Sequence, residues 1–289
     1  MVIRIFVSFL IFFLVYASLV QFILEPKPHN SPWFLEYKKA ESFIVDSVKY
    51  KAVIVGSSLS ARLNENTISE DCFNLSLAGM GSLQGLKLIK KRKYVPSLII
   101  IEINRVHAED NPGYMDMLDN KLVVWFKRKF NIFRSDFKPS NYFGFFLKSI
   151  SDKIKHIYAS DAYLLKSENS KTRQVKQIHN NKGFKKVPYN LSVLEQEKIS
   201  KSLKEIHESV VYFNEMGVQV AFVEMPSYNR ADLIKIRMGI NKIVAQERSK
   251  LIYPKKEMKF KTTDGFHLSD SSSEAYSIYI NRELKEMMK

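Results

Sequence analysis

The chain has 289 residues, 45% of them hydrophobic and 12% aromatic, which is enough for one sizeable core and excludes wholesale disorder. Its formal net charge of +15 is typical of chains that meet nucleic acid, an anionic membrane surface or an acidic polymer. The single cysteine, Cys72, excludes an internal disulfide, and its place in an apolar run predicts an inert core residue.

The amino-terminal segment from Ile5 to Leu24 is apolar and carries no charged residue. About 20 such residues suffice to cross a bilayer, so we expect an uncleaved membrane anchor. The alternative is a cleaved signal peptide, although the run is longer than a usual signal-peptide core and no clear cleavage site follows it. Arg4 and the amino terminus are the positive charges that precede the run, which favours a cytoplasmic amino terminus and an exported body.

This orientation predicts the location of the protein and the class of its partners. We expect a single-pass protein of the cytoplasmic (inner) membrane whose body lies in the periplasm or outside the cell. Nucleic acid is not an expected partner of an exported body. The basic surface is therefore expected to face phospholipid head groups or an acidic envelope polymer.

The chain divides by sequence into a transmembrane anchor at 1–25, a spacer with a lead-in helix at 26–50, and a body at 51–289. In the body, short apolar runs typical of buried strands alternate with helix-length segments. We expect strands at 52–55, 72–77, 98–104, 218–223 and 251–253, and helices at 32–46, 82–94, 192–216, 230–248 and 271–288. This alternation predicts an α/β fold with three layers, α/β/α, around a mainly parallel sheet.

The alternation breaks down between about residue 105 and residue 190, where aromatic residues mix with many lysines and arginines. For an exported domain this composition favours a surface that docks on the bilayer or on a partner. An insertion with a small core of its own and a solvated loop is an equally good interpretation. We therefore predict a basic, aromatic insertion in the body and leave both roles open.

A candidate nucleophile lies where the first expected strand of the body ends. The strand runs into Gly-Ser-Ser-Leu-Ser at 56–60. Such a tight turn places a hydroxyl at the carboxyl end of a parallel strand, which is the edge where open α/β sheets bind their ligands. The strand-to-turn pattern alone leaves Ser57, Ser58 and Ser60 as candidates.

His267 is the candidate base, because Asp264 stands three residues before it in one loop. A carboxylate that holds one ring nitrogen leaves the other nitrogen to take a hydroxyl proton, as in Ser-His-Asp enzymes. Oxyanion donors are expected at the ends of the next two strands: a backbone amide of Gly79 or Gly81, and the side-chain amide of Asn104. No pair of histidines has metal-ligand spacing, so we predict no metal and no cofactor.

Four short blocks in this sequence resemble those of the SGNH/GDSL hydrolase superfamily, and the resemblance extends from about residue 52 to the carboxyl terminus. The blocks are Gly56-Ser57-Ser58, Asn74 to Gly79, Ile103-Asn104 and Asp264-Gly265-Phe266-His267-Leu268. The last block is the most specific, and the region 105–190 is not covered. The resemblance implies a flavodoxin-like sheet, with Ser58 as nucleophile, His267 as base and Asp264 as its orienter. It also implies an oxyanion hole formed by the Ser58 amide, Gly79 and Asn104.

Two positions depart from the superfamily pattern. Ser57 stands where an acid usually precedes the nucleophile, and Arg105 stands where an acid usually follows the asparagine of the third block. The Gly-Ser-Ser variant behind an anchor is similar to membrane-tethered members that acylate envelope polymers, the DltD-like and the alginate or peptidoglycan O-acetyltransferase-like proteins. Those members imply a multispanning membrane-bound O-acyltransferase as a partner. The α/β-hydrolases are the alternative class of serine enzymes, and they would require Gly-x-Ser-x-Gly at this turn.

Three functions follow as hypotheses. The first is a serine acyltransferase that hands an acyl group, expected to be acetyl, from an acyl-enzyme to hydroxyls of an exported envelope polysaccharide. The second is an exported esterase or deacetylase, which hands the same intermediate to water. The third is a non-catalytic envelope scaffold that binds an anionic polymer or a membrane partner through the region 105–190. The anchor and the basic insertion favour the first hypothesis.

Overall fold

The computed structural model of the chain describes residues 2–22, 32–108, 116, 118–138, 142, 191–226, 231–255 and 257–287. The chain forms two compact units: Met1–Glu41 with Asn120–Gly183, and Ser42–Asp119 with Phe184–Lys289. Most of the insertion predicted at 105–190 lies outside the described residues.

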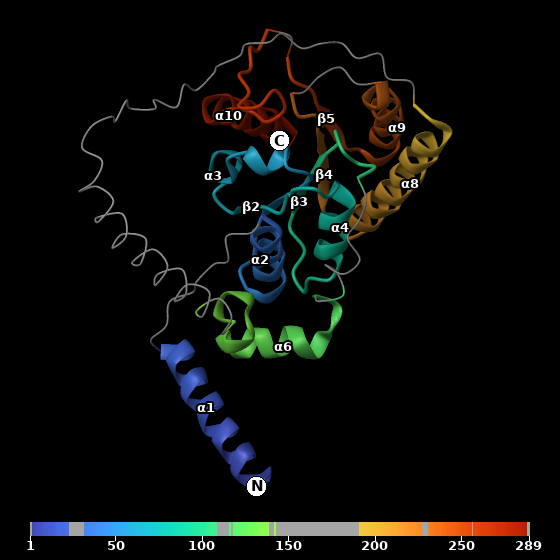
Figure 1. Cartoon of the computed structure of the whole chain (residues 1–289). Coiled ribbons are helices and arrows are strands. Elements are labelled where there is room, and N and C mark those ends of the chain that lie inside the picture. The colour runs from blue at the N-terminus through green and yellow to red at the C-terminus, as the bar shows by residue number, and fades with distance from the viewer. Residues whose placement is uncertain are drawn as a thin grey trace, which may run out of the picture. The chain divides into compact units, whose positions relative to one another are not determined.

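A five-stranded sheet lies in the second unit (Figure 1). Its strands are β1 (Ala52–Val55), β2 (Cys72–Asn74), β3 (Leu98–Glu102), β4 (Gln219–Val223) and β5 (Lys250–Ile252). All neighbouring strands are parallel, in the order β2-β1-β3-β4-β5, which is the order of flavodoxin-like doubly wound sheets. The predicted α/β class and parallel sheet are confirmed.

The helices of the second unit alternate with these strands along the chain. They are α3 (Glu65–Ile68), α4 (Ser82–Lys90), α8 (Val193–Glu215), α9 (Ala231–Glu247) and α10 (Asp270–Met287), with a 3-10 helix, η1, at Ser60–Arg62. The expected strands and helices agree with the observed bounds to within a few residues. The short α3 and η1 were not predicted, because neither is long enough to show a helical period.

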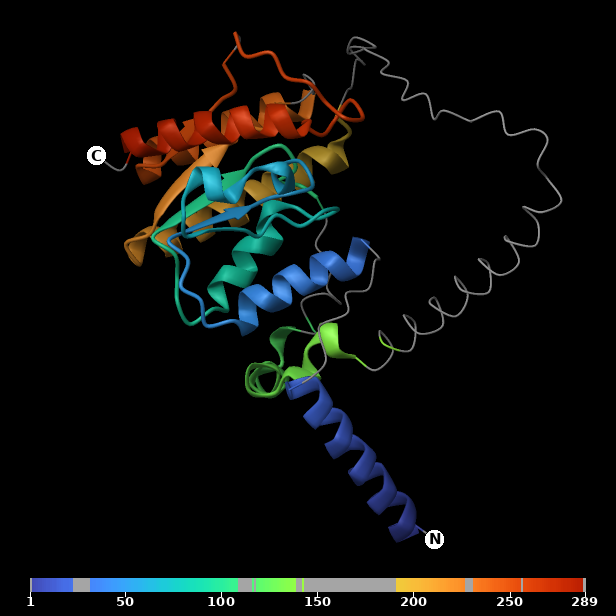
Figure 2. The same ribbon diagram turned by 90° about the vertical axis from the view of Figure 1, so that its left-hand side faces the viewer.

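The central strands β1 and β3 are buried along their whole length, as is usual in a parallel sheet. Alternate strand residues such as Ile54 and Ile100 lie in one core cluster with Tyr276 of α10, and Figure 2 shows this helix lying alongside the sheet. The next residue of β1, Val55, contacts α4 at Gly85, where a Cβ would come within 2.6 Å of the valine side chain. Neighbouring residues of β1 therefore pack into different parts of the core.

The first unit contains the amino-terminal helix and the described part of the basic, aromatic segment. Its elements are α1 (Val2–Phe22), most of α2 (Pro32–Val45), α6 (Lys121–Lys129) and the 3-10 helices η2 (Asn131–Phe133) and η3 (Ser135–Phe137). The stretch Val2–Val20 has a mean hydropathy of 2.4 and is long and apolar enough to be a membrane span or a signal sequence. Buried Lys127 of α6 donates hydrogen bonds to the Tyr37 hydroxyl at 2.8 Å and to Glu41 at 2.6 Å, which joins α6 to α2.

Candidate active site

Ser58 lies half-buried in the turn that follows β1. Its Oγ is 3.0 Å from Nε2 of His267, which lies 209 residues later in the loop before α10. Nδ1 of the same imidazole is 2.7 Å from Oδ2 of Asp264. The fold therefore brings Ser58, His267 and Asp264 into one hydrogen-bonded chain with the order of a nucleophile, a base and a carboxylate that orients the base.

The Asp264 carboxylate is fixed by the backbone of its own loop. Its Oδ1 accepts hydrogen bonds from the N–H groups of Phe266 at 2.9 Å and His267 at 2.8 Å, an Asx-type turn that aims Oδ2 at the imidazole. The backbone N–H of His267 and then its ring hold the pKa of Asp264 well below its ordinary value. The carboxylate is therefore ionised at neutral and mildly acidic pH.

Two backbone N–H groups are available at the predicted oxyanion positions. Within the part of the chain that the structure describes, neither the Ser58 nor the Gly79 amide donates to another group. Gly79 has a φ of +81°, a left-handed conformation that residues with a Cβ rarely adopt, so the turn after β2 depends on glycine here. Donors of this kind at the nucleophile edge of a sheet fit a role in stabilising an oxyanion.

Asn104, the third predicted oxyanion donor, has a structural contact. Its side chain is buried, and its amide pairs with the backbone of Met225: Nδ2 donates to the carbonyl oxygen at 2.9 Å, and the Met225 N–H donates to Oδ1 at 2.6 Å. This pairing joins the end of β3 to the end of β4. An oxyanion role of Asn104 would need the second hydrogen of Nδ2 and stays a prediction.

A buried carboxylate that the sequence patterns did not single out holds the nucleophile turn. Glu102, at the end of β3, is 1% exposed and accepts hydrogen bonds from four groups. These are the N–H and Oγ of Ser57, at 2.7 and 2.8 Å, and the N–H and Oγ of Ser60, at 3.2 and 2.5 Å. A Cβ on Gly56 would lie within 2.5 Å of the carboxylate, so glycine permits this close approach.

Glu102 brings a carboxylate to Ser57, the position at which the sequence lacks the acid expected from the resemblance. The carboxylate reaches this turn from β3 and contacts Ser57. The signal in the sequence was a single acidic residue inside the apolar run 98–104. Since a buried carboxylate must be hydrogen-bonded, an acidic residue at this position indicates a polar contact. The partners of that contact could not be predicted, because they depend on the pairing of β1 with β3.

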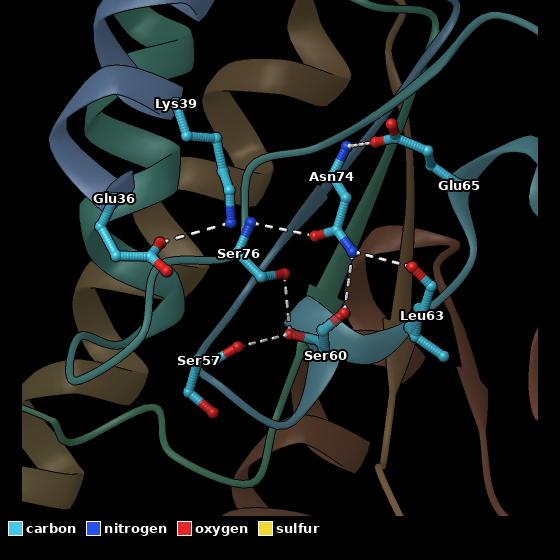
Figure 3. Close-up of polar contacts among 8 residues, drawn as sticks. All are labelled: Glu36, Lys39, Ser57, Ser60, Leu63, Glu65, Asn74 and Ser76. Atoms are coloured by element: carbon cyan, nitrogen blue, oxygen red, sulfur yellow. Dashed lines mark hydrogen bonds and ion pairs between the residues drawn. The ribbon is translucent and has the colours of Figure 1, made fainter. Parts of the chain in front are cut away.

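Asn74 braces the same turn from β2 (Figure 3). Its Nδ2 donates to the carbonyl oxygens of Ser60 at 2.9 Å and Leu63 at 3.1 Å, and its Oδ1 accepts from the Ser76 N–H at 3.1 Å. The hydroxyls of Ser60 and Ser76 are 2.8 Å apart. The second block of the resemblance thus supplies a side chain that ties the end of β2 to the nucleophile turn.

A cavity of about 710 Å³ opens beside the acid–base loop, at the ends of β4 and β5. Phe266 and Leu268 of that loop line it, on either side of His267 in the chain. On its wall, Arg237 of α9 holds the buried Glu224 through two hydrogen bonds of 2.5 Å. The side chains of Phe266 and Tyr253 are 59% and 39% exposed, so aromatic surface is available to an occupant.

No group of three or more His, Cys, Asp or Glu side chains is placed to hold a metal ion among the described residues. The site therefore offers a hydroxyl, an imidazole, a carboxylate and backbone amides as its chemical groups. Comparison of the sequence with models of protein families and with curated proteins finds no match, so the assignment of a function rests on the site geometry and the sequence motifs.

Proposed function

We propose that the protein is a membrane-anchored serine acyltransferase. It transfers an acyl group, acetyl as the expected case, to hydroxyls of an exported cell-envelope polysaccharide. The observation that carries the proposal is the hydrogen-bonded chain from Ser58 Oγ through His267 to Asp264, with distances of 3.0 and 2.7 Å. This arrangement activates a serine hydroxyl for attack on an acyl carbonyl.

The proposed reaction has two half-reactions. Ser58 Oγ attacks the carbonyl carbon of the acyl donor while Nε2 of His267 takes the hydroxyl proton, and the negative charge that develops on the carbonyl oxygen is met by the amides of Ser58 and Gly79. The imidazolium gives its proton to the leaving group, which departs and leaves an acyl-enzyme. The acceptor hydroxyl then loses its proton to His267 and attacks the ester carbon, and the bond to Ser58 Oγ breaks as the imidazolium returns the proton to that oxygen.

The cavity is lined by Phe266 and Leu268, the chain neighbours of His267, and not by Ser58, His267 or Asp264, and it supports a carbohydrate as the class of substrate. Polysaccharides are held by aromatic faces together with planar hydrogen-bonding groups, and the cavity combines Phe266 and Tyr253 with Asn241 and the Arg237–Glu224 pair. A sugar placed there would lie beside the loop that carries the base. A deacetylase would use the same wall to hold its acetylated polysaccharide, so the apolar α1 and the basic, aromatic segment, rather than the cavity, favour transfer over hydrolysis.

The proposal includes an architecture, an orientation and a partner. The helices would cover both faces of the parallel sheet in the three-layer arrangement of the SGNH superfamily, and α1 would span the cytoplasmic membrane with the sheet on the outer side. The acyl group would come from a multispanning membrane-bound O-acyltransferase in the same membrane. The resemblance in the four sequence blocks and the apolar character of α1 support these points.

Replacement of Ser58 in the producing cell tests the direction of the reaction. Ser58→Ala is expected to lower the content of ester-linked acyl groups on the envelope polysaccharide, measured as acetate released by mild alkali. Ser271→Ala is the matched control, because Ser271 is an exposed serine beyond the acid–base loop. A rise in ester content in Ser58→Ala would instead identify a deacetylase, and an unchanged content would contradict both enzymes.

A second experiment separates transfer from hydrolysis with the purified protein. An activated acetyl ester is supplied with and without a soluble sugar polymer, and both free acetate and acetylated polymer are measured. Transfer predicts that the polymer takes the acetyl group at the expense of free acetate and that Phe266→Ala reduces this share. Release of acetate at the same rate with no acetylated polymer would contradict transfer.

A further inference from the structure

The carboxyl-terminal end of α1 is part of the packing of the first unit. Residues 2–15 are exposed, but Tyr16 is half-buried, and its hydroxyl donates a hydrogen bond to the Phe137 carbonyl oxygen at the end of η3. Its ring meets Tyr142 edge-on, with the centroids 6.3 Å apart. Val20 is 2% exposed. Such contacts fit a helix that stays with the protein better than one that is removed.

These contacts place η3 beside the carboxyl-terminal part of α1, close to one end of the candidate span. The candidate span is Val2–Val20, and at 1.5 Å per residue Tyr16 lies about 6 Å inside its outer end. Helices that lie in the membrane interface bury their apolar face roughly 5–10 Å into the boundary between head groups and acyl chains. For a bilayer whose boundary lies at the end of this candidate span, the η3 backbone that Tyr16 contacts would be at interfacial depth.

The outward side of α6 carries large apolar side chains. Val124 and Lys127 are buried, so at 100° per residue Leu122 and Trp125 lie on the other side of the helix, with exposed fractions of 62% and 48%. Phe130, which caps the helix, is 47% exposed. Contiguous exposed apolar surface of this kind usually marks a membrane or protein contact.

The rings form one cluster that reaches α1. The rings of Trp125 and Phe130 meet edge-on with their centroids 6.5 Å apart, and the ring centroids of Phe126 and of Phe133 in η2 are 5.2 Å apart. The 3-10 helix η2 also contacts α1. We name the α6 surface as Leu122, Trp125, Phe126, Phe130 and Phe133. Exposed Lys121 and Lys129, at the two ends of α6, add positive charge beside it.

We propose that the α6 surface lies in the lipid interface of the bilayer that α1 crosses, with Lys121 and Lys129 beside anionic head groups. The occupant is lipid, because the surface is joined to the candidate span by direct contacts, would lie at interfacial depth in such a bilayer and combines aromatic rings with basic residues, as interfacial helices do. The inference requires α1 to be a retained span. It is independent of the chemistry at Ser58.

The two tryptophans of the chain allow a direct test. Trp33→Phe leaves Trp125 as the only tryptophan, and Trp125→Phe leaves Trp33, which is 44% exposed on α2 and is the matched control. Each full-length variant is reconstituted into vesicles whose phosphatidylglycerol carries bromine on its acyl chains. The proposal predicts blue-shifted emission from Trp125 and much stronger quenching of Trp125 than of Trp33.

Charge and fold are checked in the same preparation. Lys121→Gln with Lys129→Gln is expected to weaken the quenching of Trp125 in anionic vesicles toward the level in zwitterionic vesicles. Circular dichroism of each variant shows whether the helices are intact. No partner protein is present, so quenching reports lipid alone. Unquenched Trp125, or equal quenching of both tryptophans, in folded protein would overturn the proposal.

Discussion

At the scale of single residues, the nucleophile turn depends on the buried Glu102 carboxylate. Glu102→Gln would replace one carboxylate oxygen by an NH2 group. The four donors from Ser57 and Ser60 would then have one acceptor oxygen between them. Each buried group that loses its partner costs about 1–3 kcal/mol, so we expect a lower melting temperature. A nucleophile displaced by about 1 Å can lose about 100-fold in rate, and labelling of Ser58 by a fluorophosphonate should slow by a factor of that order.

Ser57→Ala is the graded control for this prediction. It removes one of the hydroxyls that contact Glu102 and leaves the carboxylate with its other donors. We expect a smaller loss of labelling rate and a full final extent of labelling, because Ser58, the proposed nucleophile, is unchanged. Labelling of Glu102→Gln at the wild-type rate would contradict a positioning role for Glu102.

Asp264 is expected to shape both activity and the pH dependence of stability. Its pKa is depressed in the folded chain, first by the His267 backbone N–H. The stabilisation it provides is therefore present above its unfolded pKa of about 3.9 and is lost as the pH falls through the folded pKa. Asp264→Asn should lower the melting temperature at neutral pH, and the difference from wild type should shrink below about pH 4.

The same substitution tests the orientation of the base. Loss of the orienting carboxylate in a Ser-His-Asp site can lower the rate by up to about 10⁴-fold, so Asp264→Asn should label far more slowly with fluorophosphonate at neutral pH. Asp264 stays ionised at mildly acidic pH, so protonation of this carboxylate should not limit labelling of the wild type there. An unchanged labelling rate in Asp264→Asn would show that the loop geometry alone positions the imidazole.

The sequence singled out the three side chains that form the hydrogen-bonded chain, and their catalytic roles stay a prediction. Ser58, His267 and Asp264 were identified by type, spacing and the order of the blocks, and the fold brings them together. The contacts of Glu102 and Asn104 were not predictable in the same way. Each contact depends on which strand lies next to β3, and one sequence does not state the order of strands.

At the scale of elements, α10 is attached to the sheet mainly by packing. Tyr276 is fully buried, burial raises its pKa well above the ordinary value, and its hydroxyl donates to the Glu224 carbonyl oxygen at 2.5 Å. Loss of one such hydrogen bond costs about 1 kcal/mol, whereas truncation of a buried aromatic side chain costs about 3–5 kcal/mol. Packing therefore outweighs the hydrogen bond at this position.

This comparison predicts a large gap between two substitutions. Tyr276→Phe should lower the free energy of unfolding by about 1 kcal/mol, and Tyr276→Ala by about 3–5 kcal/mol, both measured by urea denaturation. Equal losses in the two variants would mean that the hydroxyl, and not the ring, holds α10 to β4.

Elements were predicted best where apolar periodicity was long. The run from 192 to 216 became α8, and its start is fixed by a capping box in which Ser192 and Glu195 satisfy each other's backbone N–H groups. β2 was predicted to reach residue 77 but ends at Asn74. The backbone still follows β1 beyond this point, because the N–H groups of Leu75 and Leu77 donate to the carbonyl oxygens of Ile54 at 2.8 Å and Gly56 at 2.9 Å.

At the scale of the whole molecule, the single cysteine reports unfolding. Cys72 is 7% exposed on β2, and burial, with a smaller contribution from Glu65, raises its pKa to about 12. Since the thiolate is the reactive form, native protein at pH 8 should react with a maleimide only through opening of the sheet. Rapid reaction of folded protein would contradict the burial of β2.

The fold class was predictable as a whole, whereas the division into units was not. Alternating apolar runs and helical segments indicated a parallel α/β sheet, and the structure contains one. The grouping of Met1–Glu41 with Asn120–Gly183 depends on contacts such as Lys127 with Glu41. Those residues lie far apart in the chain, and no period or motif links them.

Covalent labelling by a fluorophosphonate, read by mass spectrometry of the full-length protein, tests directly whether Ser58 is an activated nucleophile. We expect one adduct per chain, located on the peptide that contains Ser58. The adduct should be absent in Ser58→Ala and should form much more slowly in His267→Gln, while Ser57→Ala and Ser271→Ala still react. The absence of an adduct on the wild-type protein, or equal labelling of Ser58→Ala, would contradict the account.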